Sequence, residues 1–370
     1  MRIAFTKCHG AGNDFALVDA RGSVLADEVW AGAARALSDR SGPVGSDGLL
    51  LLTDGGGAHA FGMRMFNPDG TEAETCLNGL RCVARAGFEA FDLRRAFVRL
   101  ATSEAEVAVD HELAPGVYTV EERAGPARLD VLAWPMSIGI DRVVDAVVGP
   151  LSPSLRFTAV AMPNPHLIAF VEAVNDVALV RMGLLCEAAP DWLPNRANVS
   201  FVETREGGLF VRTHERGAGL TDACGSAMAS TAVAAGLTGR AAFGTAITVS
   251  SPGGPVRARA EADGLVTLSG NATFEWTGEA EVDLAVGRVV GLVVTARFEA
   301  EIAAWDAARL DPAAAYGRSR PSDLWKGFMG DHKKKGDFAK NGVGGNKKQD
   351  NSDNTRSKDN NQNAGHGGHE

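Results

Sequence analysis

In the first half of the chain, hydrophobic and polar positions alternate mostly as in strands, and two stretches have the longer period of a helix. Residues 27–39 predict a helix with Asp27 as its N-cap, and a second helix follows Cys76 as far as about Phe91. Strands are predicted at residues 2–7, 15–19, 49–52 and 63–66, and as short segments within 97–135.

The second half repeats this order. Strands are predicted at 157–162, 166–171, 197–203, 208–214, 246–250, 255–260 and 265–269. A loop at Glu215–Thr221 leads into a helix from Gly225 to about Leu237, in the middle of these strands. Strands around a single central helix, twice over, predict a duplicated α+β protein.

The chain changes character beyond about residue 286. We separate an extension, 286–330, in which residues 296–316 predict one Ala-rich helix, from a tail, 331–370. The tail is rich in Lys, Asp, Asn, Gly and His and has almost nothing to bury, so we expect it to be disordered. Its three histidines, at 332, 366 and 369, indicate a solvated tract rather than a metal site.

Composition narrows the class of protein. The chain has 370 residues, 45% of them hydrophobic, which suffices for two domains, and a formal net charge of −9. This balance does not favour a nucleic-acid or membrane partner. Neither a signal peptide nor a transmembrane run is recognisable, so we expect a cytoplasmic protein. Five cysteines without a CxxC pair favour neither a disulfide framework nor a zinc site.

Two of the cysteines have an unusual context. Cys76 and Cys224 each directly precede a small-residue stretch with helical character, so each is expected at a helix N-terminus, where the pKa of a thiol is lowered. Two such thiols facing each other could move a proton on and off one carbon. A disulfide between them is the alternative, disfavoured in the cytoplasm. We interpret Cys8, Cys82 and Cys186 as small buried hydrophobic residues.

Polar residues near these cysteines suit a zwitterionic ligand. Glu215 could accept from an amine and Arg216 could bind a carboxylate, although a surface ion pair is the simpler interpretation. His166 is either a core histidine or a modulator of a thiol pKa. Asparagines at turns would add uncharged donors and acceptors: Asn13, Asn67, Asn78, Asn164 and Asn198.

Six motifs in order resemble one known family. They are His9–Phe15, Phe66–Glu74, Asn78–Cys82, Asn164–His166, Glu215–Gly219 and Ala223–Ser226. From Met1 to about Val282 the chain resembles the diaminopimelate epimerases. The resemblance implies an isomerase that interconverts LL- and meso-2,6-diaminopimelate in lysine and peptidoglycan-precursor biosynthesis. It implies a pyridoxal-independent enzyme with neither cofactor nor metal, and a homodimer.

The same resemblance implies a fold and boundaries. The family has two pseudo-symmetric halves, each a curved mixed sheet wrapped round a central helix, with the active site in the cleft between them. We therefore expect one half at 1–126 plus 271–285, with Cys76, and the other at 127–270, with Cys224.

The resemblance also implies residue roles. Cys76 and Cys224 would be the two acid/base residues, and the N–H groups of Leu77, Asn78, Gly225 and Ser226 would hold the reacting carboxylate. Asn13 would contact the reacting end. His166 and Glu215 would modulate the thiol pKa values, and Glu215 would also take an amine. The distal L-centre would be read by Asn67, Asn164, Asn198 and Arg216.

Four positions depart from the family pattern, and two rival functions stay open. The family usually has Gly at Leu77, Gly at Pro163, Gln at Gly48 and Met at Cys8. One rival is a related two-cysteine racemase or epimerase acting on another amino acid, such as proline or hydroxyproline. The other is a non-catalytic amino-acid-binding protein or a thiol redox protein.

Overall fold

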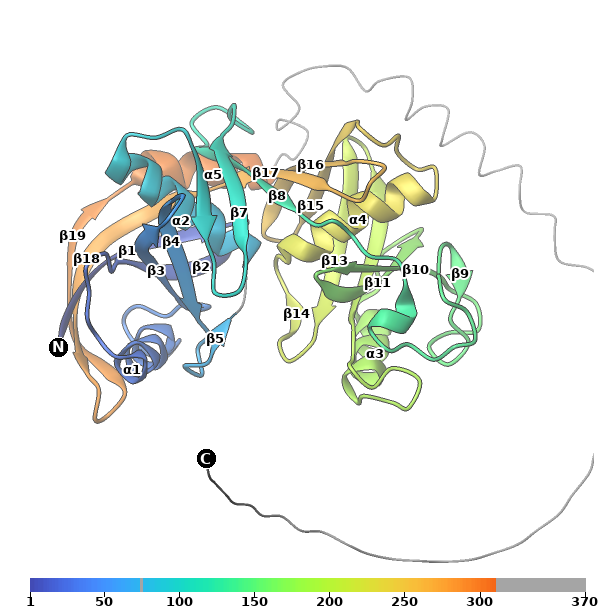
Figure 1. The fold of residues 1–370 in the computed structure, drawn as a ribbon, viewed down its shortest axis with the longest axis horizontal. Helices are drawn as coiled ribbons and strands as arrows, with labels where there is room; N and C mark the ends of the chain where they lie inside the picture. The colour runs from blue at the N-terminus through green and yellow to red at the C-terminus, as the bar shows by residue number, and fades with distance from the viewer. Residues whose placement is uncertain (74–75, 311–370) are drawn as a thin grey trace, which may run out of the picture. The chain divides into compact units, whose positions relative to one another are not determined.

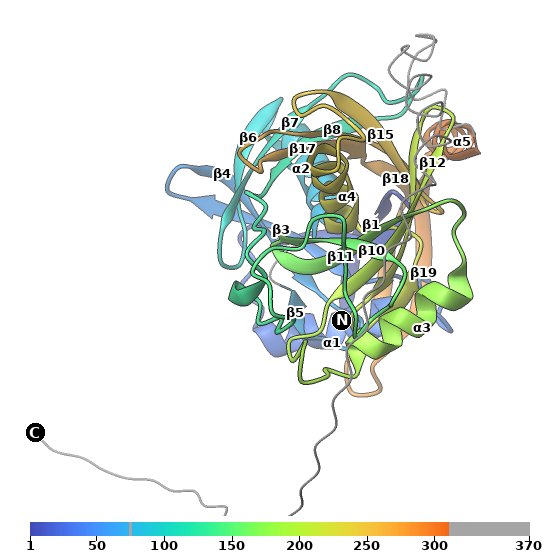
Figure 2. The same cartoon turned by 90° about the vertical axis from the view of Figure 1, so that its right-hand side faces the viewer.

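The fold is organised around two helices, α2 (Leu77–Phe91) and α4 (Gly225–Leu237). The computed structural model describes residues 1–73 and 76–310. Viewed along the long direction of the described part, α2 and α4 lie near the middle and strands surround them (Figure 2). This arrangement confirms the predicted α+β class with a helix inside each set of strands.

Strands of the first half pack around α2. They are β1 (Arg2–Gly10), β2 (Asn13–Asp19), β3 (Leu49–Gly56), β4 (His59–Phe66), β5 (Glu72–Ala73), β6 (Arg95–Arg99), β7 (Glu104–Val109) and β8 (Thr119–Ala124). Most neighbours are antiparallel, whereas β2–β3 and β4–β6 are parallel. Outside this layer lies α1 (Asp27–Ser38), whose N-cap is Ala26 and not Asp27 as predicted. Asp27 instead lies in the first turn, where its charge complements the helix dipole.

The second half surrounds α4 in the same way (Figure 1). Its strands are β9 (Ala146–Val147), β10 (Arg156–Met162), β11 (Asn164–Val171), β12 (Asn198–Arg205), β13 (Gly208–Glu215), β14 (Gly219–Thr221), β15 (Ala246–Ser251), β16 (Gly254–Ala260) and β17 (Val266–Asn271). A short 3₁₀ helix covers Val131–Ala133, and α3 (Asp176–Glu187) packs on β12 and β13. The end of the loop predicted at Glu215–Thr221 is wrong, because β14 pairs there with β13.

The two halves share one sheet. β8 pairs antiparallel with β17, from Thr119↔Asn271 to Ala124↔Val266, and the chain then returns to the first half because β18 (Thr273–Asp283) pairs with β1. The domain boundaries expected from the sequence stay a prediction.

A glycine in each central helix allows an aromatic ring to approach the helix closely, from β4 in the first half and from the turn before β15 in the second. A Cβ atom at Gly87 would lie 2.5 Å from the ring of Phe61, and one at Gly236 would lie 2.5 Å from the ring of Phe243. Both helices therefore give up a side chain to make room for an aromatic ring. The two halves repeat this packing as well as their order of elements.

The end of the described chain adds a strand and a helix. β19 (Arg288–Arg297), which the sequence analysis did not predict, pairs with β18, and α5 (Glu299–Leu310) follows. Trp305 of α5 is buried against Gly254 and belongs to a hydrophobic cluster with Ala11 of the first half and Ala223 of the second. The extension thus contacts both halves through Trp305. Residues 311–370, which include the predicted tail and the end of the predicted helix, lie outside the described part of the chain. Within the described part, no helix is long and apolar enough to cross a membrane.

Candidate active site

Cys76 is the N-cap residue of α2. Its backbone is extended (φ −149°, ψ 107°), and its Sγ atom accepts a hydrogen bond from the Gly79 N–H at 3.5 Å. The same sulfur lies 3.7 Å from Oδ1 of Asn13, which also accepts from Nδ2 of Asn78 at 3.4 Å. Cys76 therefore faces both the free N–H groups of a helix start and a side-chain amide from β2.

Cys224 holds the same place at the start of α4, again with an extended backbone (φ −130°, ψ 107°). Its Sγ atom lies 3.4 Å from Oγ of Ser226, and burial together with the nearby charge of the Glu215 carboxyl group raises the pKa of this thiol. Glu215 also accepts a hydrogen bond from the Thr221 hydroxyl. Thus the second thiol has a carboxyl neighbour where the first has an amide.

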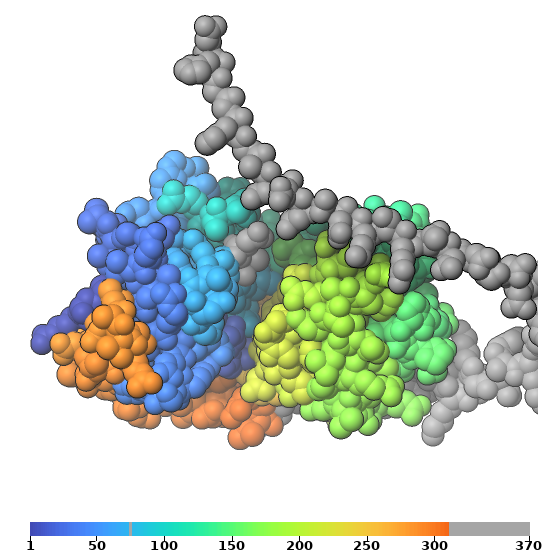
Figure 3. All heavy atoms as spheres, turned by 90° about the horizontal axis from the view of Figure 1, so that it is seen from below, coloured from blue at the N-terminus to red at the C-terminus, as the bar shows by residue number. Residues whose placement is uncertain are grey.

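The two helix starts meet each other. A Cβ atom at Gly225 would lie 2.9 Å from Cβ of Leu77 and 3.3 Å from Oδ1 of Asn78, so a side chain there would have to displace its neighbours. The space-filling view shows the two halves side by side with a furrow between them (Figure 3). The charge of Glu215 acts on Cys76 as well as on Cys224. The structure thus brings together the candidates that the sequence placed on separate helices.

His166 reaches Cys224 through Ser226. Its Nε2 atom lies 3.0 Å from Oγ of Ser226 and 3.1 Å from Oδ1 of Asn164. Burial, helped by the positive charge of Arg216, lowers the pKa of His166 to about 3. The imidazole that contacts the Ser226 hydroxyl is therefore neutral.

Glu215 and Arg216 do not pair with each other. The Arg216 N–H donates to Oδ1 of Asn198 at 2.9 Å, and its guanidinium donates to the Asn195 carbonyl at 3.0 Å. Glu215 instead accepts from the Thr221 hydroxyl, and its charge acts on the second thiol. The alternative interpretation, a surface ion pair between Glu215 and Arg216, is therefore wrong among the described contacts, and the two side chains contact different neighbours.

Asn67 lies apart from this group. It is in the turn after β4, where its Nδ2 atom donates to the Thr71 hydroxyl at 3.0 Å and its carbonyl accepts from the Gly70 N–H at 2.9 Å. Neither of these contacts reaches another candidate residue. The structure supports its predicted turn, and its predicted role in binding stays a prediction.

Comparison with known proteins identifies the family. The family profile described as "Diaminopimelate epimerase" matches residues 5–129 and 158–275. The chain belongs to the diaminopimelate epimerase family. The diaminopimelate epimerase of Enterococcus faecalis is 36% identical over 308 residues, covering 80% of this chain and 94% of its own. That of Synechococcus elongatus is 39% identical over 285 residues, covering 76% of this chain and 99% of its own.

Solved structures share the fold at low identity. A hydroxyproline epimerase from Agrobacterium vitis has a TM-score of 0.56 at 15% identity, covering 84% of this chain and 98% of its own. A phenazine biosynthesis protein of the PhzF family from Bacillus anthracis has a TM-score of 0.56 at 17% identity, covering 76% and 100%. These likenesses show the fold class of this family member.

The expectation of lowered thiol pKa values is wrong for both cysteines of this diaminopimelate epimerase family member. Burial raises the pKa of Cys76 to about 12, although the Gly79 N–H acts in the opposite direction. Burial and the Glu215 charge raise the pKa of Cys224 well above its usual value. A helix N-terminus does favour a thiolate, but the loss of hydration outweighs it here. Burial also raises the pKa of Glu215, which makes it a better proton acceptor than an exposed carboxylate.

The departures from the family pattern fit the fold. Leu77 is the first residue of α2 and is not among the residues with positive φ, so it takes the place of Gly without backbone strain. A Cβ atom at Gly48 would lie 2.7 Å from the Phe66 carbonyl oxygen, so a side chain there would require a shift. Pro163 is exposed just before β11. Cys8 is fully buried, as are Cys82 and Cys186, which confirms their interpretation as core residues, and all five cysteines are free.

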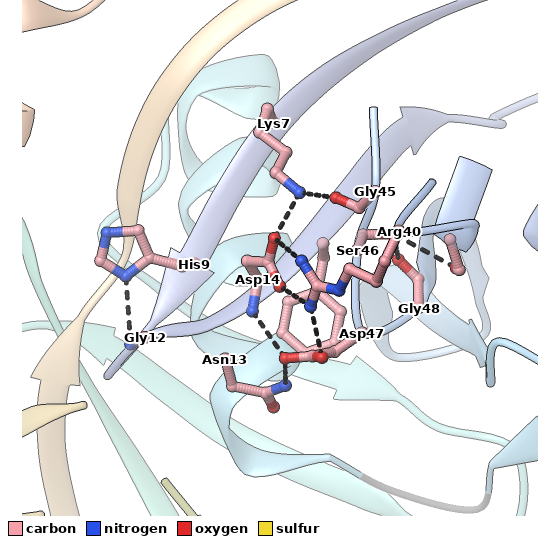
Figure 4. Close-up of polar contacts among 12 residues, drawn as sticks. Lys7, His9, Gly12, Asn13, Asp14, Arg40, Gly45, Ser46, Asp47 and Gly48 are labelled. Atoms are coloured by element: carbon pink, nitrogen blue, oxygen red, sulfur yellow. Dashed lines mark hydrogen bonds and ion pairs between the residues drawn. The ribbon is translucent and has the colours of Figure 1, made fainter. Parts of the chain in front are cut away.

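Sequence reasoning missed the charged residues that flank Asn13 (Figure 4). Asp47 accepts from Nδ2 of Asn13 at 2.7 Å, and Arg40 joins Asp47 to Asp14, which also pairs with Lys7. The only sequence signal was the position of Asp47 beside Gly48, where the family pattern changes.

A second charged group lies behind Asn78. Arg81, fully buried, donates to Oδ1 of Asn78 at 2.7 Å and to Oε1 of Glu122 at 2.6 Å. Sequence reasoning missed this group too, because its members meet only in the fold.

Proposed function

We propose that the protein is a pyridoxal-independent epimerase that interconverts LL- and meso-2,6-diaminopimelate, a step of lysine and peptidoglycan-precursor biosynthesis. The observation that carries this proposal is the pair of cysteine-capped helix starts that meet at Leu77 and Gly225. Membership of the diaminopimelate epimerase family supports the substrate.

The chemistry is a proton transfer between two thiols across one carbon. One cysteine of the pair Cys76 and Cys224, as thiolate, removes the α-proton and becomes a thiol. The other, as thiol, delivers its proton to the opposite face and becomes a thiolate. One C–H bond breaks and another forms, the total number of protons is unchanged, and the roles exchange in the reverse direction.

The reacting carboxylate is held by the two helix starts. The N–H groups of Leu77, Asn78, Gly225 and Ser226 lie in first helical turns, where backbone donors lack intrahelical partners. The same donors stabilise the negative charge that spreads from the α-carbon into the carboxylate during the reaction. This role requires the two helix starts to stay in contact.

Glu215 and His166 modulate the thiols in this proposal. Glu215 accepts the Cys224 proton and takes the substrate ammonium. His166 acts through the Ser226 hydroxyl and stays neutral, because its lowered pKa lies far below physiological pH. Both residues therefore act on Cys224, which faces one side of the substrate α-carbon.

The remaining polar candidates recognise the ends of the substrate. Asn13, beside Cys76, contacts the reacting end. The distal L-centre is read by Asn67, Asn164, Asn198 and Arg216. A guanidinium suits a carboxylate because it offers two parallel N–H donors. This chemistry needs neither cofactor nor metal, and we further propose a cytoplasmic homodimer.

Deuterium exchange tests the proposal. We expect the reduced wild-type protein in D₂O to place deuterium at the α-carbon of LL-diaminopimelate and to form the meso isomer. Cys76→Ala and Cys224→Ala should each abolish epimerisation. Cys186→Ala, which changes a fully buried cysteine of the second half, is the matched control and should stay active. Full epimerase activity in either of the first two variants would refute the two-thiol assignment.

A substrate panel separates the rivals. Exchange into proline or hydroxyproline, without exchange into diaminopimelate, would indicate the related racemase class. Binding without exchange into any amino acid would indicate a binding or redox protein.

A further inference from the structure

A directed row of hydrogen bonds passes beside Cys76. Arg81 donates to Oδ1 of Asn78, Nδ2 of Asn78 donates to Oδ1 of Asn13, and Nδ2 of Asn13 donates to Asp47. The N–O distances along this row are 2.7, 3.4 and 2.7 Å. We call these four residues the amide row. Every link runs in the same direction, from the guanidinium to the carboxylate.

The two ends of the amide row fix that direction. A guanidinium only donates hydrogen bonds, so Arg81 requires the oxygen of the Asn78 amide. An ionised carboxylate only accepts, so Asp47 requires the nitrogen of the Asn13 amide. Each amide taken alone could be rotated by 180°, but Arg81 at one end and Asp47 at the other require the same direction of hydrogen bonding through both amides. Figure 4 shows the Asn13 nitrogen directed at Asp47 and its oxygen directed away.

Both ends are themselves anchored. Arg81 is fully buried and is held by Oε1 of Glu122 at 2.6 Å and by the Asn271 carbonyl at 3.2 Å. Asp47 accepts from Arg40 at 2.5 Å and from the Asp14 N–H at 3.2 Å. The orientation of the two amides therefore depends on ion pairs that do not touch the thiol.

We infer that Asp47 and Arg81 are positioning residues that hold the Asn13 amide with its carbonyl oxygen, and not its NH₂ group, against the Cys76 sulfur. An oxygen at 3.7 Å accepts from the S–H group and opposes a thiolate, whereas an NH₂ group would favour the thiolate. Cys76 therefore rests as a thiol. If the proposed function holds, Cys76 has to lose this proton before it can act as the base.

Other charges also face Cys76. Glu122 and Glu215 raise its pKa and Arg81 lowers it, so a test has to separate a turned amide from a changed charge. Asp47 allows this separation. Asp47→Ala removes both the charge and the acceptor, whereas Asp47→Asn removes the charge and keeps a carbonyl that can accept from Asn13.

The experiment measures the rate at which iodoacetamide alkylates Cys76 against pH in the full chain, by peptide mass spectrometry and without substrate. We expect Asp47→Ala to speed alkylation about tenfold at pH 8, because the released amide can turn and donate to the thiolate. Asp47→Asn should match the wild type. Asp14→Ala is the matched control, because Asp14 shares Arg40 but does not touch the Asn13 amide, and it should also match the wild type.

Two results would overturn the inference: an unchanged rate in Asp47→Ala, or an equal acceleration in Asp47→Asn or Asp14→Ala. Cys224 in the same digest is an internal reference and should react as in the wild type. If Asp47→Ala does not fold, Asp47→Ser replaces it, because its shorter side chain falls short of the Asn13 amide and should give the same acceleration. No substrate is present, so this outcome is independent of whether the protein epimerises diaminopimelate.

Discussion

The surroundings of Cys76 and Cys224 differ although their backbone positions are alike. Each cysteine is the N-cap of a central helix, in nearly the same extended conformation. Cys76 meets the neutral amide of Asn13, whereas Cys224 meets the carboxyl group of Glu215. The duplicated fold thus repeats the placement of a thiol and varies the group that shares its proton. Burial raises the pKa of both thiols, and the neighbours make them unequal.

Glu215→Gln should have the largest effect on activity, because it removes the carboxyl group that distinguishes the surroundings of Cys224 from those of Cys76. Loss of the carboxylate removes the acceptor for the Cys224 proton, so we expect kcat to fall about 100-fold or more. Iodoacetamide should nevertheless alkylate Cys224 faster, because the charge that raises the pKa of this thiol is gone. Steady-state kinetics and peptide mass spectrometry measure the two effects.

Glu203→Gln is the matched control for Glu215→Gln. Glu203, on β12, pairs with Arg205 instead of with a thiol, and its loss should leave kcat unchanged. A wild-type kcat in Glu215→Gln would show that catalysis does not require different neighbours for the two thiols.

His9 in the first half and His166 in the second are both buried, and the loss of their hydration gives a prediction of intermediate size. Burial lowers the pKa of His9 to about 4 and that of His166 to about 3. Both lie below the unfolded value near 6.5, so the unfolded chain binds more protons as the pH falls. Stability should therefore be lost from about pH 6.5 downwards, by about 2 kcal/mol per histidine between pH 7 and pH 5.

Urea unfolding at pH 7 and pH 5 measures this loss for the wild type, His9→Gln and His166→Gln. Each variant should lose less stability than the wild type, by about 2 kcal/mol, because one proton-binding group of the unfolded chain is gone. His111→Gln, at an exposed position, is the control and should behave as the wild type. An unchanged pH dependence in one variant would mean that its histidine has the same pKa in the folded and the unfolded protein.

Leu77→Gly should have the smallest effect. It restores the residue usual in the family on the Cys76 side, keeps the N–H group at this position and removes the contact with Gly225. We expect a loss of about 1 kcal/mol in unfolding free energy from the flexibility of glycine, with little change in kcat. Leu184→Gly, an exposed leucine in α3, is the matched control for helix propensity. A large fall in kcat in Leu77→Gly alone would assign the leucine side chain to the site.

Local features were predictable to a large extent. The starts of α2 and α4 followed from small residues after Cys76 and Cys224, and the strands around them from their hydrophobic patterns. β19 was missed although its valines favour a strand, because most of its residues are exposed and the strand has no clearly buried face. Asp47 and Arg81 were missed because a charged side chain acquires such a role only from the partner it meets.

The sequence by itself determined where each thiol stands on its own helix, since N-caps and helix starts depend on neighbouring residues. Only the tertiary structure decided how each thiol holds its proton. Hydration is lost through burial by distant strands, and the Asn13 and Asn78 amides take their direction from Asp47 and Arg81, which lie on other elements or behind the site. Desolvation and hydrogen-bond direction are properties of a three-dimensional neighbourhood, which no local stretch of sequence contains.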